Sequence, residues 1–461
     1  MTIDPLAHPV SQSTTLLFAA VLVAMIVSLA LEEKLHAKKS LIVGIFAVIS
    51  LLLATAMHLL PFGDITLPNG HPISIPVYIP GVDWGVIAII LGSSVFVDVT
   101  SRSGLFTWIA VKLTKASRGD PLKLLWYYGL MTVLFSAVLN NVTAMIIVGS
   151  LTGVSLKKLN RSDKLLGFLF LEGLLTNIGG MLTLISSVPN IIVGNAAGIS
   201  FLRFFLAASP YVLVTTIATI FLGARLFRIQ KLSTAEEKEE AAFLIKSFDE
   251  NDGIEGRAFF WFGAFMLVAF ILTIATTSVL PVAKELGMGF VAIGFAVIML
   301  IRYKSEVEQF YKAVDWDLII FFVALFVVIN VMEHAMVLEL IGKGITFIIG
   351  EGENLFGTAA LLISSAAFSS VTDNIPLAAM LAKILVAQGT AGDSALWWSV
   401  VFGANLGGNL TPIGSASTLV AITIIHKYKL PMSFAAFVKL AVPYAALQIV
   451  FAVAYVLLFL A

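Results

Sequence analysis

The stretch NIGGMLTLISS at Asn177–Ser187 returns as NLGGNLTPIGS at Asn405–Ser415, 228 residues later, with seven of eleven residues identical. Two further landmarks recur at nearly the same spacing. The first is VDW, which occurs at Val82–Trp84 and again at Val314–Trp316. The second is SAVLNNV at Ser136–Val142, which returns as SSVTDNI at Ser369–Ile375. Self-similarity at a fixed spacing indicates internal duplication. We therefore expect two copies of one structural unit.

The composition places both copies in a membrane. Of the 461 residues, 59% are apolar and only 12% are charged, whereas soluble domains are about one quarter charged. Several stretches of at least 18 residues contain no charged side chain, and four of them settle the class because each can cross a bilayer as a helix: Thr14–Leu31, Ser40–Leu60, Phe204–Ala224 and Leu440–Ala461. Met1–Gln12 has no basic residue, so we interpret Thr14–Leu31 as a retained span instead of a cleaved signal peptide.

The charge balance and the residue types exclude several function classes. Lys plus Arg equals Asp plus Glu at 28 each, so the field expected of a nucleic-acid-binding protein is absent. The chain has no cysteine, which excludes disulfides, thiolate metal sites and a cysteine nucleophile. It also lacks the HExxH and GxSxG motifs of metalloproteases and hydrolases. We expect a protein that is not an enzyme and holds no cofactor or metal.

Basic residues predict the topology, because they favour connections on the cytoplasmic side. They cluster on alternate connections, whereas the long connection 61–83 has none. The prediction is a multi-pass protein of the plasma (inner) membrane with its N-terminus outside. The charged segment 228–257 becomes a cytoplasmic linker, expected to be a solvated tether with one short helix. Leu105–Leu113, flanked by basic residues, is expected to lie along the cytoplasmic surface.

This topology makes the two copies inverted, since the helix at Trp84 then enters the membrane from outside and the helix at Trp316 from inside. The predicted fold is an all-α polytopic membrane protein with two inverted-topology repeats, re-entrant hairpins and broken helices, about ten full spans plus two hairpins. Its parts are residues 1–227 with the first repeat, the linker 228–257, and residues 258–461 with the second repeat. Such repeats are typical of secondary transporters, which bind substrate near the midplane.

The duplicated stretches are the predicted breaks. Apolar half-helices flank each of them, and glycines, which permit non-helical backbone, occupy their centres. Unpaired backbone groups are tolerated at membrane depth only where they line a polar cavity. The alternative is a glycine-rich crossing of tightly packed helices. The candidate binding residues in the breaks are Asn177, Gly179, Gly180, Ser186, Ser187, Asn405, Gly407, Gly408 and Ser415.

The tips of two predicted hairpins add polar candidates. The first tip contributes Asn140, Asn141 and Thr143, and the second contributes Asp373 and Asn374. These side chains can cap the following helix or bind a solute. Because Asp373 replaces Asn140 and gives the cavity an ionisable group, it is the first choice for a proton- or cation-coupling residue.

Two other ionisable residues fall within predicted helices. Glu172 is either a second coupling residue or a polar packing residue. Asp98 lies four residues before Arg102, which predicts an ion pair along the helix.

The motifs NNVTAMIIV, TDNIPLAAML, NIGGMLTLISSVPNIIVG and GANLGGNLTPIGSASTL resemble those of the ion-transporter superfamily. This superfamily includes ArsB-type arsenite permeases, P-protein-like permeases, NhaD-type sodium/proton antiporters and divalent-anion/sodium symporters. The resemblance extends from Trp84 to the C-terminus, and the last motif looks most like the arsenite permeases. It implies a scaffold domain, a moving domain with both hairpins and both broken helices, elevator-like alternating access, and a homodimer.

Departures from the superfamily's motifs affect the choice of substrate. The Ser-Asn-Thr signature of the dicarboxylate carriers is absent from both tips, and no arginine is predicted near the midplane to bind a carboxylate. Uncharged arsenous acid suits a mostly neutral cavity. We therefore expect proton-coupled efflux of arsenite or antimonite, with a sodium/proton antiporter as the alternative and other anion symporters or a channel as further possibilities. The expected partners are a small inorganic solute, a coupling ion (H⁺ or Na⁺) and the lipid bilayer.

Overall fold

The computed structural model describes residues 10–60, 64–66, 71–76, 78–350, 354–372 and 374–461. The first half of the chain contains α1 (Gln12–Ala30), α2 (Glu32–Leu35), α3 (Lys39–Ala56), the antiparallel strands β1 (Asp64–Thr66) and β2 (Pro72–Ser74), α4 (Trp84–Arg102), α5 (Leu105–Ser117), α6 (Pro121–Val138), α7 (Asn141–Lys158), α8 (Leu165–Gly179), α9 (Val188–Ala196) and α10 (Phe201–Leu226). The linker carries α11 (Ala235–Ile245). The second half contains α12 (Arg257–Thr276), α13 (Pro281–Leu300), α14 (Val307–Ala313), α15 (Trp316–His334), α16 (Val337–Ile349), α17 (Leu355–Ser369), α18 (Asn374–Ala387), α19 (Ala395–Gly407), α20 (Ala416–Lys427) and α21 (Phe434–Tyr455).

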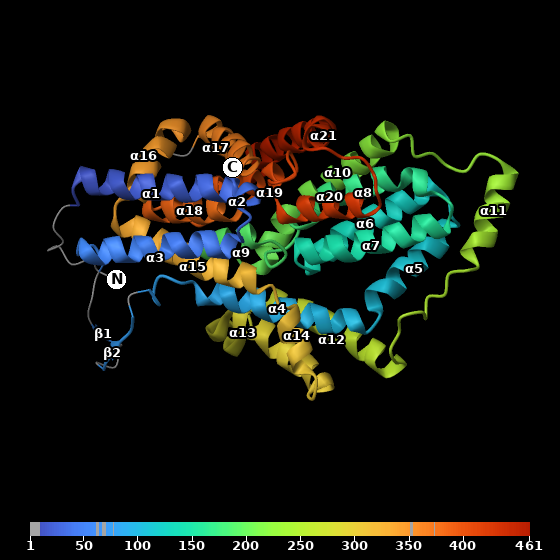
Figure 1. Ribbon diagram of the computed structural model, residues 1–461, viewed down its shortest axis with the longest axis horizontal. Coiled ribbons are helices and arrows are strands. Elements are labelled where there is room, and N and C mark those ends of the chain that lie inside the picture. The colour runs from blue at the N-terminus through green and yellow to red at the C-terminus, as the bar shows by residue number, and fades with distance from the viewer. Residues whose placement is uncertain (1–9, 61–63, 67–70, 77, 351–353, 373) are drawn as a thin grey trace.

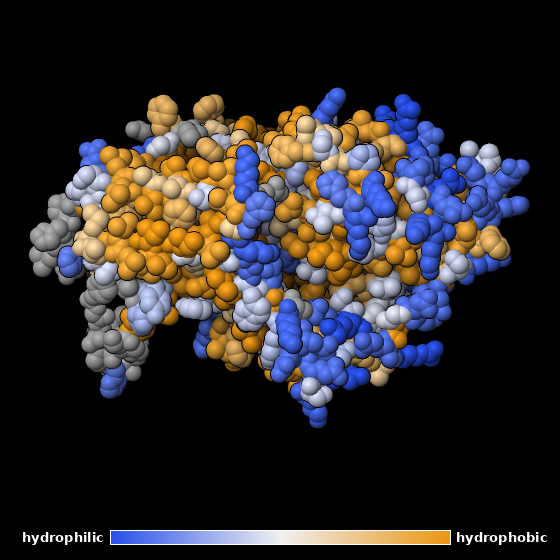
Figure 2. Space-filling view, in the orientation of Figure 1, coloured by the Kyte–Doolittle hydropathy of each residue, from blue (hydrophilic) through white to orange (hydrophobic). Residues whose placement is uncertain are grey.

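The fold is almost entirely helical, as predicted. Nine of the described helices are long and apolar enough to cross a membrane, and α17, α18 and α20 are shorter apolar helices. Large apolar side chains remain exposed on them, for example Leu52 and Phe265, each 67% exposed. Figure 2 shows a broad hydrophobic surface, with hydrophilic residues gathered at the end of the molecule that carries α11. A surface of this kind suits contact with lipid.

The two halves repeat each other in local detail. Asp83 caps α4 by accepting from the Val86 amide at 3.1 Å, and Asp315 caps α15 by accepting from Leu318 at 3.0 Å. The indole N–H of Trp84 donates to the carbonyl of Ile79, and that of Trp316 donates to Tyr311, in both cases five residues back. The halves also interlock, since α3 packs along α15 and α13 packs along α4.

The two helix pairs that contain the predicted hairpins lie at opposite ends of the molecule. In Figure 1, α6 and α7 lie toward the end occupied by α11, whereas α17 and α18 lie toward the end occupied by β1 and β2. The broken helices α8 and α19 pack against α6 and α17, respectively.

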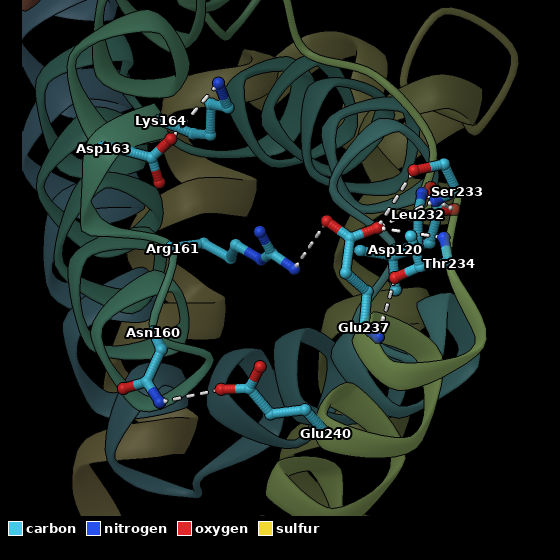
Figure 3. A network of polar contacts seen from close by, with 10 residues as sticks. All are labelled: Asp120, Asn160, Arg161, Asp163, Lys164, Leu232, Ser233, Thr234, Glu237 and Glu240. Carbon is cyan, nitrogen blue, oxygen red and sulfur yellow. Dashed lines mark hydrogen bonds and ion pairs between the residues drawn. The ribbon is translucent and has the colours of Figure 1, made fainter.

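The linker is more than the expected tether. It contains one helix, α11, which starts with a capping box of Thr234 and Glu237, but it also docks on the ends of α6 and α7. The amide of Leu232 donates to Asp120 Oδ2 at 3.2 Å, and Asn160 Nδ2 donates to Glu240 Oε1 at 3.3 Å (Figure 3). Apolar linker side chains are buried in this contact as well: Ile229, Leu232, Ala241 and Phe248.

α5 is a separate helix, as predicted, bounded by the left-handed residues Gly104 and Arg118. It packs against α6. Asp98 and Arg102 of α4 interact electrostatically, but they do not come within the distance of a direct ion pair. Arg102 instead donates to Gln309 Oε1 at 2.9 Å and stacks over Phe310, whereas Asp98 Oδ2 is buried and has no partner in the described part of the chain. A contact with α14 therefore replaces the predicted pair within α4.

Candidate functional site

Both predicted helix breaks are present. The first lies between the end of α8 at Gly179 and the start of α9 at Val188, and the second between the end of α19 at Gly407 and the start of α20 at Ala416. We predicted that glycines occupy the breaks because they permit non-helical backbone, and this explanation is wrong. Gly180 and Gly408 have ordinary helical φ angles of −60° and −58°.

Close approach explains the glycines instead. A Cβ on Gly179 would lie 2.6 Å from the Val133 carbonyl oxygen of α6, and one on Gly407 would lie 2.3 Å from the Ala366 carbonyl oxygen of α17. A Cβ on Gly180 would lie 2.5 Å from Asn141 Oδ1. These glycines let each broken helix touch the backbone or the tip of its neighbouring hairpin.

Each hairpin is bonded to its own broken helix by the same two hydroxyl contacts. Ser136 Oγ donates to the Thr176 carbonyl at 2.6 Å, and its counterpart Ser369 donates to Ala404 at 2.5 Å. Thr183 Oγ1 donates to Ala137 and Thr411 Oγ1 to Ser370, both at 2.5 Å. The duplicated Ser and Thr residues therefore fix hairpin and break as one unit in each half.

Asn177 links the first break to the second. Its Nδ2 donates to Asn409 Oδ1 and to Ser415 Oγ, each at 2.9 Å, and its Oδ1 accepts from Ser417 Oγ at 2.8 Å. All four side chains are buried. The three partners lie in or next to the second break, so the amide of Asn177 crosses between the two copies.

Asn405 makes the reciprocal crossing. Its Oδ1 accepts from Ser187 Oγ at 2.8 Å, and its Nδ2 donates to Asn190 Oδ1 at 2.9 Å and to the Val401 carbonyl at 2.8 Å. The predicted residues Asn177, Ser187, Asn405 and Ser415 thus form two buried sets of reciprocal contacts between the two breaks. We call Asn177, Ser187, Asn190, Asn405, Asn409, Ser415 and Ser417 the amide cluster.

The carbonyls freed by the first break are also paired. Asn190 Nδ2 donates to the carbonyls of Gly180 at 2.7 Å and Thr183 at 2.9 Å, and Ser186 Oγ donates to the same two carbonyls at 2.6 and 2.8 Å. Burying these groups without partners would be costly. Ser186 therefore stabilises the break itself.

The first hairpin tip forms the more accessible edge of the cluster. Asn140, Asn141 and Thr143 are half-buried. Asn140 caps α7 through a 2.9 Å bond from the Val142 amide, while Asn141 accepts from Ser136 at 2.9 Å and its Nδ2 lies 3.5 Å from Asn177 Oδ1. Of the second tip, Asn374 is buried, and Asp373 lies outside the described residues.

Glu172 lies more than one helical turn from Asn177 on α8 and is 1% exposed. Its Oε1 accepts from Thr152 Oγ1 of α7 at 2.6 Å. Its Oε2 is buried and has no partner in the parts of the chain that the structure describes. One carboxyl oxygen therefore has a partner and the other has none among the described residues, which is compatible with either expected role of Glu172, coupling or polar packing.

Sequence reasoning missed a second layer behind Asn177. Asn409 Nδ2 donates to Gln448 Oε1 at 2.8 Å, and Gln448 Nε2 donates to Thr219 Oγ1 at 3.2 Å, with all three residues fully buried. Asn409 stands where the first copy has Met181, so the repeat gave no signal for it. A single glutamine in the apolar helix α21 was the available signal for Gln448.

The arrangement suits binding through neutral groups. Every side chain of the amide cluster is an amide or a hydroxyl, and these offer donors and acceptors without charge. Within the described residues there is no group of three His, Asp or Glu side chains that could hold a metal ion.

The sequence is similar to a family of transporters and to several individual membrane proteins. The sequence model of the CitMHS family, described as "Citrate transporter", matches residues 41–403. A 46 kDa membrane protein of Mycobacterium leprae is 31% identical over 81% of this chain and 85% of its own, and an uncharacterized transporter of Mycobacterium tuberculosis is 30% identical over 81% and 86%. The mouse P protein is 24% identical over 82% of this chain and 54% of its own.

Two solved structures share the fold. The YdaH transporter of Alcanivorax borkumensis has a TM-score of 0.60 at 12% identity and covers 92% of this chain and 98% of its own. MtrF of Neisseria gonorrhoeae, from a class of antimetabolite efflux pumps, has a TM-score of 0.57 at 14% identity and covers 92% and 95%.

Proposed function

Since the chain belongs to the CitMHS citrate transporter family, we propose that it is a secondary active transporter that moves a small solute across the plasma membrane by alternating access. The observation that carries this proposal is the reciprocal crossing of Asn177 and Asn405 between the two helix breaks. Paired breaks that meet in one polar cluster are the arrangement of secondary transporters. The hairpins at opposite ends of the molecule support inverted repeats in residues 1–227 and 258–461, joined by the linker 228–257.

The leading substrate is arsenite or antimonite in its uncharged, hydroxylated form. Such a solute is a small polyol that amides and hydroxyls can bind by exchanging hydrogen bonds. The half-buried Asn140, Asn141 and Thr143 give it an accessible edge, and Asn141 approaches Asn177. The other proposed binding residues, Ser187, Asn405 and Ser415, are buried. Gly179, Gly180, Gly407 and Gly408 act by close packing, and Ser186 by pairing freed carbonyls, so we assign these five residues to the frame of the site.

Asp373 and Glu172 are the proposed coupling residues. Glu172 lies in the moving part of the molecule with one carboxyl oxygen unpartnered among the described residues. An ionisable residue inside a membrane protein is a functional candidate because the charged form is costly there. We propose that each carboxyl carries a proton during part of the transport cycle. We also propose that the protein is a homodimer. Its linker lies on the cytoplasmic side of the membrane and its N-terminus lies outside.

Citrate is the second candidate, and the description of the family favours it. A tricarboxylate is usually bound by arginine or lysine, whereas the amide cluster is neutral. Citrate would therefore have to bind in a neutralised form, or with help from groups other than the cluster. A sodium/proton antiporter remains the alternative in which Asp373 binds the cation directly.

A flux assay with the purified full chain in proteoliposomes tests the proposal. Arsenite, citrate and sodium are tested in parallel under an imposed pH gradient. We expect saturable arsenite flux driven by the gradient, abolished as coupled flux in Asp373→Asn and Glu172→Gln and unchanged in the exposed control Asp393→Asn. Citrate flux without arsenite flux would favour the second candidate, and a pH response to sodium alone would favour the antiporter. Non-saturable flux of any of them would indicate a channel and contradict the proposal.

A further inference from the structure

A line of buried hydroxyl groups connects Glu172 with the linker end of the molecule. We infer that Thr152, Ser155, Tyr128 and Thr114 form the route by which protons reach and leave Glu172. This inference rests on the proposed function, because it gives the proposed coupling residue its access to water. None of these four residues belongs to the duplicated motifs.

The route starts at Glu172 itself. Thr152 Oγ1 of α7 donates to Glu172 Oε1 at 2.6 Å, and both side chains are buried. Ser155 lies one turn further along α7, and residues three apart on a helix have Cβ atoms about 5–6 Å apart. The two hydroxyls are not hydrogen-bonded to each other in this structure, so the proposed route requires a hydroxyl rotation or one bridging water at this step.

From Ser155 the hydroxyls are in direct contact. Ser155 Oγ lies 2.7 Å from Tyr128 OH of α6, and Tyr128 OH lies 2.7 Å from Thr114 Oγ1 of α5. Ser155 is 4% exposed, and Tyr128 and Thr114 are fully buried. The line therefore crosses three helices and ends in the last turn of α5, where Ser117 accepts from the amide of Gly119 at 3.1 Å.

The end of the line faces the docked linker. A Cβ on Gly119 would lie 2.8 Å from Cβ of Ala241 in α11, and Asp120 accepts from Leu232. The polar contacts of α11 in Figure 3 surround this end of α6 and α7. The line thus ends beneath the docked linker at the hydrophilic end of the molecule, where Thr114 and Ser117 are fully buried. Proton uptake from water therefore requires this linker contact to open, and Glu172 lies between this end and the amide cluster.

Few charged groups compete for the proton. Among the elements packed against α8, α6 presents Tyr128 of the route, α10 carries Tyr211, which donates to the Gln448 carbonyl, and the turn Ser162–Lys164 carries Asp163 and Lys164, which pair with each other. α10 also carries Arg203 and Arg225 near its two ends. The basic side chains of α6, α7 and α20 lie at helix ends, namely Lys123, Lys157, Lys158 and Lys427. Within the described residues none of them forms an ion pair with Glu172, and His426 of α20 bonds to the Met432 carbonyl.

The proton balance is simple. A proton from water binds to the hydroxyl oxygen of Thr114, and each hydroxyl of the route transfers its own proton to the next one. At the last step the O–H bond of Thr152 breaks as an O–H bond forms on the carboxylate of Glu172. Thr152 receives a new proton from the preceding hydroxyl. Release of the proton reverses these steps. No oxidant, reductant or other reactant is needed.

A pH-jump experiment on the full chain in proteoliposomes tests the route without knowledge of the solute. The infrared carbonyl band of protonated Glu172 is assigned by its loss in Glu172→Gln, and its rate of appearance is measured after acidification. We expect Tyr128→Phe to slow protonation at least tenfold. The neighbouring Tyr127→Phe is the matched control and should keep the wild-type rate, because Tyr127 lines an apolar surface cavity with Leu130 and Leu134.

A second pair of variants covers the case in which Tyr128→Phe does not fold. Thr152→Val should slow the appearance of the same band, and Thr152→Ser, which keeps the hydroxyl, should restore it. Wild-type rates in both Tyr128→Phe and Thr152→Val would overturn the route. Absence of solute flux in the wild type, with the band still slowed in the variants, would instead overturn the proposed function and leave the route standing.

Discussion

The amide nitrogen of Asn177 lies 2.9 Å from the hydroxyl oxygen of Ser415, although 238 residues separate them in the sequence. The reciprocal pair, Ser187 and Asn405, is 2.8 Å apart across 218 residues. In each pair an asparagine that begins one duplicated stretch meets the serine that ends the other. The two duplicated breaks therefore contact each other through two reciprocal hydrogen bonds.

The first prediction concerns Asn177, which makes three short side-chain bonds in the buried cluster. Asn177→Ala leaves Asn409 Oδ1 without a partner and removes one hydrogen bond each from Ser415 and Ser417, which stay bonded to each other. An unsatisfied buried polar group costs about 1–3 kcal/mol, so the melting temperature of the purified protein should fall and solute flux should be lost. Asn251→Ala, in an exposed part of the linker, should change neither. An unchanged melting temperature in Asn177→Ala would contradict the described cluster.

A second prediction tests the role of close approach. Gly407→Ala would bring a Cβ to within 2.3 Å of the Ala366 carbonyl oxygen, and overpacking of this kind costs about 1–3 kcal/mol. Thermal unfolding in detergent should start at a lower temperature. Gly44→Ala is the control, because nothing lies within 4 Å of the added methyl group. Equal stability of the two variants would mean that α19 and α17 are not in contact.

A third prediction concerns the pH dependence of linker docking. Hydrogen bonds from Lys112 and Lys115 of α5 lower the pKa of Glu250 from 4.5 to about 2. Because this pKa is lowered by folding, the contact stabilises the docked linker fully above pH 4.5, weakens as the pH falls below that value, and is lost below about pH 2. Trypsin cleavage cannot be followed at such a pH, so exchange of linker amides with deuterium is the measurement.

Linker exchange corrected for its intrinsic pH dependence should be equally slow at pH 7 and pH 5 and faster at pH 3. Glu250→Gln should exchange quickly at all three, whereas the exposed control Glu236→Gln should behave like the wild type. A rise in exchange between pH 7 and pH 5 in the wild type would point to a different titrating group.

A fourth prediction concerns the ion pair between Lys383 of α18 and Glu333 of α15, which are 3.1 Å apart. It joins the second hairpin to a helix that packs with α3. Lys383→Glu and Glu333→Lys alone place like charges together and should lower both the melting temperature and flux. The double exchange should restore them if the pair acts as a unit. Failure of the double variant to recover would show that the two residues act separately.

The sequence alone was sufficient for the class of fold and for the position of both breaks. Spans without charge and the duplicated Asn-x-Gly-Gly motif carry that information, because the motif is polar in an otherwise apolar background. The boundaries at Gly179 and Val188, and at Gly407 and Ala416, lie within a few residues of the expectation.

The partners across the molecule could not be predicted. Which serine faces Asn177 depends on how α8 and α20 pack, and helix periodicity gives no such register. Asn409 and Gln448 were not predicted, because neither has a counterpart in the first copy that would have identified it. Arg102 was assigned to Asp98 by spacing alone, whereas it donates to Gln309 of α14, a helix far along the chain. The docking of the linker depends on small apolar contacts, such as Phe248, within a strongly charged segment.

The proposed transport cycle requires two copies of one unit that lie in opposite orientations in the membrane. The chain has no cysteine, so single cysteines can be placed at the exposed residues Tyr78, just before α4, and Tyr311, just before α15. A membrane-impermeant maleimide added to intact cells should label Tyr78→Cys and leave Tyr311→Cys unlabelled until the membrane is opened. Labelling of both positions from the same side would contradict the inverted repeat, and with it the shared site and the proposed transport cycle.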